Sequence, residues 1–293
     1  MKTTFSLIKS SGTVTFSFLK LIRIGNVVMM AAGVYLGAFL VQGPSINLLS
    51  PILLKASLVS ALLGAAGYMM NDLLDVEADK INRPRRPLVS GAISISVGWG
   101  LFALFLLGAI IGSFGLTIAH QLIFVATLLL ICLYNLWLSK LPLIGNLSIG
   151  VVVALTILFG ALPFELTSTV WIAAGFAFLT TLSREIVKDV EDLEGDRVIG
   201  ARTMPVLFGA TPCVQMVQGI SMLVVLASVL PYLTANFGGL YLIVISVTDL
   251  LLLLPMSRAG NIPDSAKYQS SSLKWAMLTG MIALAFSDSI PTY

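Results

Sequence analysis

Nine apolar segments follow one another along the chain, and they restrict its possible folds more than any other feature. Each is close to the length of about 20 residues that a helix needs to cross roughly 30 Å of hydrocarbon. Only 11% of the residues are charged, against about 25% in soluble domains, and no segment alternates as a barrel strand does. The sequence therefore predicts an all-α membrane protein, a bundle of nine transmembrane helices. The expected spans are about 22–42, 51–71, 92–112, 116–137, 144–163, 168–186, 211–233, 238–256 and 272–288.

The distribution of Lys and Arg predicts how the bundle is oriented. When the connections are assigned alternately to two sides, all but one of the 17 Lys and Arg residues fall on the side of the N-terminus, and the exception is Lys55. Because basic connections stay in the cytoplasm, we expect a multi-pass protein of the cell membrane with residues 1–20 inside and the C-terminus outside. The long connections at about 72–91 and 187–210 are then cytoplasmic, within one domain that covers residues 1–293.

Two acidic segments interrupt the apolar pattern, at the cytoplasmic ends of the second and sixth expected helices. They hold most of the 14 Asp and Glu residues of the chain. In both, Asp recurs at i, i+3 and i+7, offsets that share one helical face at about 100° per residue. Carboxylates this close repel one another unless a cation neutralises them, so solvated acidic loops are the weaker interpretation. The positions are Asp72, Asp75 and Asp79 in the first segment and Asp189, Asp192 and Asp196 in the second.

These side chains predict a site for divalent cations. Carboxylate and amide oxygens are the hard ligands that Mg²⁺ prefers, and Mg²⁺ also keeps several waters and binds substrate phosphates. We therefore expect a Mg²⁺ cofactor that holds a phosphorylated substrate. The expected metal ligands are Asn71, Asp72, Asp75, Asp79, Asp189, Asp192 and Asp196.

Basic residues flank both acidic segments. Arg83 and Arg86 follow the first, and Arg184 and Lys188 precede the second, one helical turn apart. Charge-assisted hydrogen bonds from such groups to phosphate oxygens would stabilise pyrophosphate as a leaving group. The alternative is that these cations only follow the positive-inside bias. We favour binding for Arg184 and Lys188, and both interpretations stay open for Arg86.

Other polar residues have two interpretations each. Tyr134 ends the fourth expected helix, where it presents a hydroxyl or ring face to a cation or anchors the helix at the membrane interface. Asn26 and Asn146 contact substrate or make hydrogen bonds between helices. Asp249 is a carboxylate inside an expected span, where an unpaired charge is costly, and the sequence indicates no partner for it.

The paired acidic motifs resemble those of the UbiA superfamily of intramembrane prenyltransferases. The resemblance implies transfer of a prenyl chain from a prenyl diphosphate, with Mg²⁺, to an acceptor held at a lateral membrane opening. It also implies an apolar central cavity for the prenyl tail and cytoplasmic active-site loops. The motifs are Asn71-Asp72-x-x-Asp75-x-x-x-Asp79 and Asp192-x-x-x-Asp196.

The resemblance extends to the substrate site. The family has a Tyr-x-x-Lys element after the fourth helix, which Tyr134 and Lys140 match with a longer gap. The residues expected to act in catalysis are Asp72, Asp75, Asp192 and Tyr134. The residues expected to bind the diphosphate or the acceptor are Arg23, Asn26, Arg83, Arg86, Lys140, Asn146, Arg184, Lys188, Arg202 and Lys274.

Within the family, residues 79–91 and 184–196 are most similar to the archaeal digeranylgeranylglyceryl phosphate synthases. Those enzymes move a geranylgeranyl group from its diphosphate to the free hydroxyl of geranylgeranylglyceryl phosphate in ether-lipid synthesis. The resemblance implies a prenyl diphosphate donor, a lipid-like phosphorylated acceptor and contact with membrane lipid, with no nucleic acid and no obligatory protein partner. The alternative within the family is an aromatic quinone precursor or a chlorophyllide-like acceptor.

Two classes outside the family are also alternatives. A cation transporter needs charges near the bilayer midplane and broken helices, whereas both acidic segments lie at one face of the expected bundle. A non-catalytic binder would hold prenyl diphosphate without turnover, and the complete pair of acidic motifs argues against lost catalysis.

Overall fold

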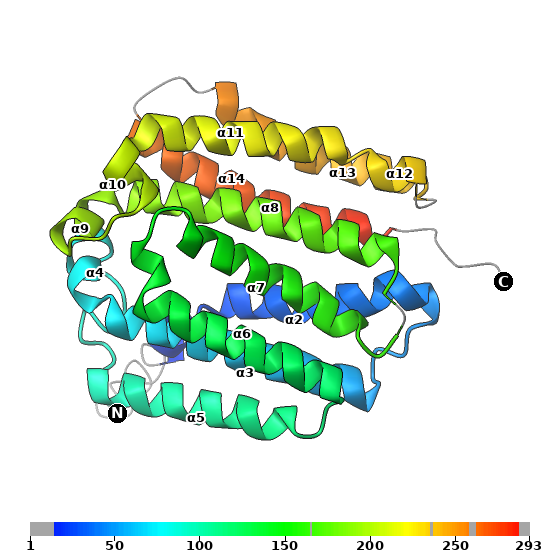
Figure 1. Cartoon of the computed structure of the whole chain (residues 1–293), viewed down its shortest axis with the longest axis horizontal. Helices are drawn as coiled ribbons and strands as arrows, with labels where there is room; N and C mark the ends of the chain where they lie inside the picture. The colour runs from blue at the N-terminus through cyan, green and yellow to red at the C-terminus, as the bar shows by residue number, and fades with distance from the viewer. Residues whose placement is uncertain (1–14, 165, 235–236, 258–261, 287–293) are drawn as a thin grey trace, which may run out of the picture.

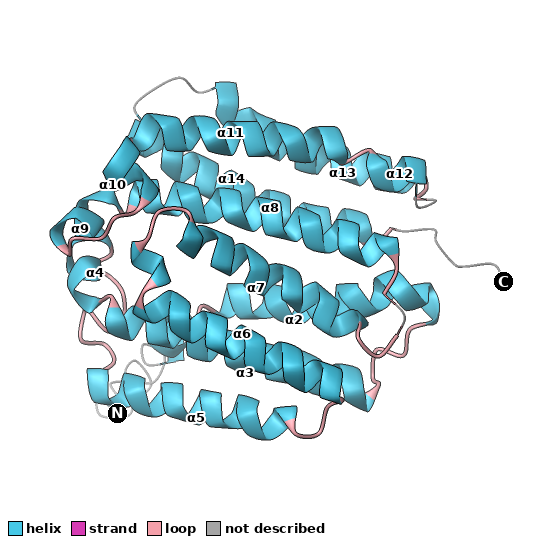
Figure 2. Ribbon diagram, in the orientation of Figure 1, coloured by secondary structure: helices cyan, strands magenta, loops and turns pink. Residues whose placement is uncertain are grey.

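The computed structural model describes residues 15–164, 166–234, 237–257 and 262–286. Within these ranges the regular elements are all helices (Figure 2). Each expected apolar segment coincides with a long helix. The long helices are α2 (Ile24–Gln42), α3 (Pro51–Leu74), α5 (Ile95–Ser113), α6 (Ile118–Leu136), α7 (Ile144–Ala161), α8 (Ser168–Glu191), α11 (Ala210–Ala227), α13 (Gly239–Leu253) and α14 (Ile262–Leu284). The short elements are α4 (Val76–Asn82), α9 (Leu193–Val198), α10 (Met204–Phe208), α12 (Leu230–Thr234), η1 (Gly43–Ser45), η2 (Leu138–Lys140) and η3 (Leu254–Ser257).

The described part of the chain contains seven helices that are long and apolar enough to cross a membrane. They are α2 with η1, α3, α5, α6, α7, α8, and α11 with α12. Helix α13 has only 15 residues, fewer than a span needs, and α14 carries Lys267 and Lys274. The molecule is therefore an all-helical, multi-pass membrane protein. The two further spans of the expected nine stay predictions.

The helices form three groups across the bundle (Figure 1). Helices α2, α7 and α8 lie in the middle, with α3, α5 and α6 on one side and α11, α13 and α14 on the other. The short helices α4, α9 and α10 gather at one end of the bundle, at the left of Figure 1. The two acidic motifs lie at this end, since they include α4 and α9.

Glycines allow α2 and α7 to pack with their backbones in contact. A Cβ on Gly37 would lie 1.9 Å from the carbonyl oxygen of Ile157, and a Cβ on Gly160 would lie 1.8 Å from that of Val34. Small residues serve the same purpose at other helix pairs in membranes, where dispersion contacts replace the hydrophobic effect between helices. This contact holds α2 firmly against α7 in the middle of the bundle.

The spacing of the acidic motifs suggested that each lies on one continuous helix. In the structure, each motif is divided between two helices. Helix α3 ends at Leu74, and α4 begins at Val76 after Asp75, whose φ and ψ are −96° and 15°. Helix α8 likewise ends before Asp192, whose φ and ψ are −93° and 3°, and α9 follows directly. Each motif therefore turns a corner at its central Asp. The expected loops 72–91 and 187–210 contain α4, α9 and α10.

Candidate active site

The side chain of Asn82 joins the two acidic motifs. Its Nδ2 donates to the carbonyl oxygen of Asp192 at 3.0 Å, and its Oδ1 accepts from the backbone N–H of Gly195 at 3.0 Å. A Cβ on Gly195 would lie 2.3 Å from this amide group, so the glycine makes room for the contact. Sequence reasoning missed Asn82 as a site residue, because its partners lie more than 100 residues further along the chain.

The two motifs line one small polar cavity of about 50 Å³. Five of the six motif aspartates face it, whereas Asp72 is 3% exposed and lies outside the lining. The structure therefore brings most of the expected metal ligands to one place, as their spacing predicted. Those that line the cavity are Asn71, Asp75, Asp79, Asp189, Asp192 and Asp196, together with Arg83, Arg86, Tyr134, Lys140 and Lys188.

Arginines bind three of the motif aspartates. Arg83 Nη2 lies 2.8 Å from Asp192 Oδ1. Arg86 bridges the first motif, with its Nη1 3.0 Å from Asp72 Oδ1 and in contact with Asp79 Oδ2. Both arginines were expected to bind diphosphate. In the structure both pair with carboxylates, and their binding of diphosphate stays a prediction.

Arg23 anchors the start of α2 to the first motif. Its Nη2 lies 2.5 Å from Asp72 Oδ1 and donates to Asn71 Oδ1 at 3.0 Å. The guanidinium carbon also lies 5.0 Å from the centre of the Tyr68 ring, within the range of a cation–π contact. The backbone of Arg23 is left-handed, with φ 51°, so these contacts offset local strain. Arg23 therefore positions Asp72, and its guanidinium borders the site.

The other three motif aspartates accept hydrogen bonds from neutral groups. Asn71 Nδ2 donates to Asp75 at 2.6 Å, Asn146 Nδ2 to Asp189 at 2.8 Å, and Thr203 Oγ1 to Asp196 at 3.0 Å. Asn146 therefore makes a hydrogen bond between α7 and α8, and a contact of Asn146 with substrate stays a prediction. Neutral donors orient a carboxylate without cancelling its charge, which is how second-shell groups present metal ligands.

The electrostatics of the polar cavity fit a divalent cation. Burial raises the pKa of Asp79 and of Asp196 to about 6, and it also raises the pKa of Asp75. Nearby carboxylates act in the same direction, as Asp72 does on Asp79. Among the described residues, no three acidic, His or Cys side chains are already clustered as a metal site. Mg²⁺ needs only one or two carboxylates beside waters and substrate phosphates, so the donor set suits this ion.

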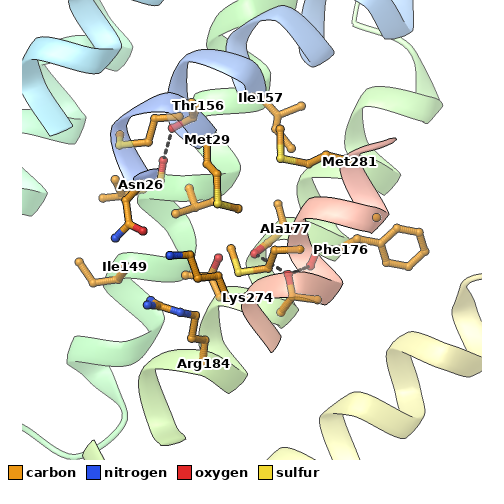
Figure 3. Close-up of a pocket in the computed structure, with 18 of the residues that line it drawn as sticks. Asn26, Met29, Ile149, Thr156, Ile157, Phe176, Ala177, Arg184, Lys274 and Met281 are labelled. Atoms are coloured by element: carbon orange, nitrogen blue, oxygen red, sulfur yellow. Dashed lines mark hydrogen bonds between the residues drawn. The ribbon is translucent and has the colours of Figure 1, made fainter. Parts of the chain in front are cut away.

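A larger cavity of about 170 Å³ lies between the helices (Figure 3). Apolar side chains from α2, α7, α8 and α14 form most of its wall, among them Met29, Ile149, Ile157, Phe176 and Met281. Three residues line both cavities, namely Asn71, Tyr134 and Lys188. The two cavities are therefore neighbours, and a molecule with a polar head and an apolar chain could occupy both.

Glu185 is a buried member of the site that sequence reasoning did not single out. It is 6% exposed and accepts hydrogen bonds from Arg184 Nη1 at 3.2 Å and from Lys188 Nζ at 3.0 Å. The i,i+3 spacing to Lys188 was the available signal. All three residues line the apolar cavity, so Glu185 sets the positions of both cations.

The remaining expected residues divide between the site and the surface. Asn26 and Lys274 line the apolar cavity, and Lys140 lines the polar one. Arg202 is exposed and borders neither cavity; its backbone N–H donates to the carbonyl oxygen of Lys140. Asp249, for which the sequence indicated no partner, accepts a hydrogen bond from Ser228 Oγ at 2.9 Å and lines the apolar cavity.

Comparison with known proteins shows which family the chain resembles. The model of the UbiA prenyltransferase family matches residues 29–278. The digeranylgeranylglyceryl phosphate synthase of Haloquadratum walsbyi is 32% identical over 273 residues, which cover 92% of this chain and 93% of that protein. The synthase of the same name from Methanobrevibacter smithii is 34% identical over 288 residues, covering 94% and 99%.

Solved structures agree with the sequence relatives. A structure described as digeranylgeranylglyceryl phosphate synthase in membranes is 30% identical, with a TM-score of 0.71 over 94% of this chain and 98% of that one. A UbiA homolog from Archaeoglobus fulgidus, bound to GPP and Mg²⁺, shares the fold at 17% identity, with a TM-score of 0.66 over 92% and 99% of the two chains. The chain belongs to the UbiA prenyltransferase family.

Proposed function

We propose that the protein transfers a geranylgeranyl group from geranylgeranyl diphosphate to the free hydroxyl of geranylgeranylglyceryl phosphate. The observation that carries this proposal is the junction of the two cavities, where a carboxylate-lined polar cavity meets an apolar one at Asn71, Tyr134 and Lys188. A prenyl diphosphate has the matching polarity, with a charged head and a long apolar chain. The names of the relatives from Haloquadratum walsbyi and Methanobrevibacter smithii support this donor and acceptor.

The residues of the polar cavity bind the diphosphate and its cation. Asp75, Asp189 and Asp196 are the carboxylates with neutral hydrogen-bond partners, and they hold Mg²⁺ together with Asp79 and Asp192. When bound, Mg²⁺ supplies positive charge that stabilises pyrophosphate as it leaves. Of the remaining motif residues, Asn71 positions Asp75 by its hydrogen bond, and Asp72 is joined to Asn71 through Arg23 and to Asp79 through Arg86.

The transfer breaks one bond and forms another. The carbon–oxygen bond between the prenyl chain and its diphosphate breaks, and pyrophosphate takes the electron pair. The hydroxyl oxygen of the acceptor bonds to the allylic carbon and gives its proton to the released pyrophosphate. Lys188, beside the junction, donates hydrogen bonds to the departing oxygens, and the ring of Tyr134 faces the developing cation. The apolar wall excludes water, which would otherwise capture the cation.

The same proposal includes an orientation in the cell membrane. The N-terminus and the end of the bundle with α4, α9 and α10 face the cytoplasm, the C-terminus lies outside, and residues 1–293 act as one domain. Lys and Arg residues concentrated on one side of the bundle support this arrangement. The donor and the acceptor then meet at the cytoplasmic face with their chains in the membrane.

A transfer assay tests the proposal. Purified protein in detergent receives radiolabelled geranylgeranyl diphosphate, Mg²⁺ and either geranylgeranylglyceryl phosphate or 4-hydroxybenzoate, with EDTA as a control. We expect labelled ether lipid from the glyceryl phosphate, and no product with EDTA. Product from the aromatic acceptor alone would move the enzyme to quinone synthesis. Binding of the donor without transfer to any acceptor would favour a non-catalytic binder.

A further inference from the structure

Lys274 crosses the cavity from α14 to the start of α2. Its Nζ lies 3.8 Å from the point that a Cβ on Gly25 would occupy. In Figure 3 its side chain lies with those of Arg184 and Asn26 at the same part of the cavity. These three residues come from α14, α8 and α2 and line the apolar cavity, whereas none of them lines the polar cavity with the aspartates. We call them the basic subsite.

Lys274 differs from the other cations of this cavity in having no protein partner among the described residues. Arg23 is bound to Asp72, and Arg184 and Lys188 share Glu185. The other carboxylate that lines the cavity, Asp249, accepts a hydrogen bond from Ser228 and forms no ion pair with Lys274. The basic subsite therefore has more positive than negative charge.

The unpaired charge of Lys274, beside an apolar wall, favours the binding of an anion. The side chain of Lys274 lines the cavity and is exposed, so its ammonium is accessible to a charged ligand. A bound anion beside Lys274 would supply the charge partner that the described residues do not give it. A phosphate fits this set well, because Arg donates in a fork, Lys donates as a point charge and the Asn amide adds a neutral N–H.

We infer that the basic subsite binds the phosphate of the acceptor, separately from the diphosphate of the donor. The inference rests on the proposed function, which requires two phosphorylated substrates at once. The donor diphosphate occupies the polar cavity with the aspartates, so the acceptor phosphate needs other cations. Lys274 and Arg184 supply them on the wall formed by α14 and α8. The basic subsite would then select a phosphorylated glyceryl ether over an unphosphorylated one.

Kinetics with two acceptors test this assignment. The acceptors are geranylgeranylglyceryl phosphate and geranylgeranylglycerol, which lacks the phosphate. In Lys274→Gln we expect KM for the phosphorylated acceptor to rise about 10- to 100-fold, the range for loss of a charged hydrogen bond. KM for geranylgeranyl diphosphate should stay the same, and the preference for the phosphorylated acceptor should shrink by the same factor. Lys274→Arg should restore most of this preference.

Lys267→Gln is the matched control. Lys267 lies on the same helix, is exposed and lines neither cavity, so the substitution removes the same charge without touching the subsite. An unchanged acceptor preference in Lys274→Gln would overturn the inference, as would an equal rise in KM for the donor. If the wild-type enzyme does not use geranylgeranylglyceryl phosphate at all, the proposed function itself fails. The wild-type arm therefore separates the two failures.

Discussion

The six motif aspartates divide by the charge of their hydrogen-bond partners. Asp72, Asp79 and Asp192 contact arginine, while Asp75, Asp189 and Asp196 contact only neutral donors in the described structure. An arginine already offsets the charge of the first group. The second group has no such cation beside it, so its oxygens are available to a metal ion. The same local sequence pattern thus yields two kinds of carboxylate.

Asp75→Asn should abolish transfer while the protein still folds. The substitution keeps the shape of the side chain and removes the charge that we assign to cation binding. We expect the turnover rate to fall about 10²-fold or more, as for the loss of other transition-state charge stabilisers. Glu77→Gln is the control, because Glu77 is 75% exposed and pairs with the exposed Lys80. Normal turnover in Asp75→Asn, measured by radiolabel transfer, would contradict the assignment.

Binding of Mg²⁺ should weaken as the pH falls below about 6. Burial raises the pKa of Asp79 and Asp196 to about 6, so both carboxylates take up protons as the pH falls through that value. Metal ligands must be deprotonated, so each titrating carboxylate costs about tenfold in affinity per pH unit below its pKa. Calorimetric titration with Mg²⁺ at pH 7.5 and pH 5 measures the change. Equal affinity at the two pH values would show that these carboxylates do not bind the ion.

At the scale of elements, the apolar segments predicted the long helices well, because length and hydropathy alone determine a spanning helix. The corners at Asp75 and Asp192 were not predicted. Their spacing fits one continuous helical face, and the contacts that accompany the breaks join distant parts of the chain, as Asn82 does with Gly195. Glu185 was missed for a related reason, since its burial depends on how α8 packs. Local spacing could indicate the pairing of Glu185 with Lys188, but it carries no information about the burial of Glu185 or the contact between Asn82 and Gly195.

Gly160→Ala should destabilise the bundle, because a Cβ there would lie 1.8 Å from the carbonyl oxygen of Val34. Backbone atoms cannot move aside as the end of a flexible side chain can. The distance between α2 and α7 must therefore increase. We expect a loss of roughly 1–3 kcal/mol, the range for overpacked sites, seen as a lower melting temperature in detergent. Gly175→Ala on α8 is the control, because nothing lies within 4 Å of the added Cβ. There the better helix propensity of Ala should leave stability unchanged or higher. A melting temperature for Gly160→Ala equal to that of Gly175→Ala would show that the two helices adjust freely.

For the whole molecule, the sequence predicted that the two acidic motifs lie at the same end of the bundle. The acidic motifs and most basic residues were expected on one side, and the structure brings α4 and α9 together at one end (Figure 1). The basic subsite could not be predicted in this way. Lys274 is more than 200 residues from Gly25 and Asn26 in the chain, and only the packing of α14 near α2 brings them to one cavity. The positive charge of Lys274 indicated a phosphate-binding role, and the tertiary structure shows which residues lie near it.

The orientation of the bundle is open to a direct test with cysteine labelling in intact cells. The starting variant has Cys132 and Cys213 replaced by Ser. In it, Ser45→Cys places a thiol on the connection between α2 and α3, and Ser90→Cys places one in the connection after α4. Both positions are exposed. Since a spanning helix separates the two connections, they lie on opposite sides of the membrane if α3 crosses it. A membrane-impermeant thiol reagent should label Ser45→Cys in intact cells and Ser90→Cys only after the cells are opened. The reverse pattern would put the carboxylate-lined cavity outside the cytoplasm, where the positive-inside bias disfavours its many arginines and lysines.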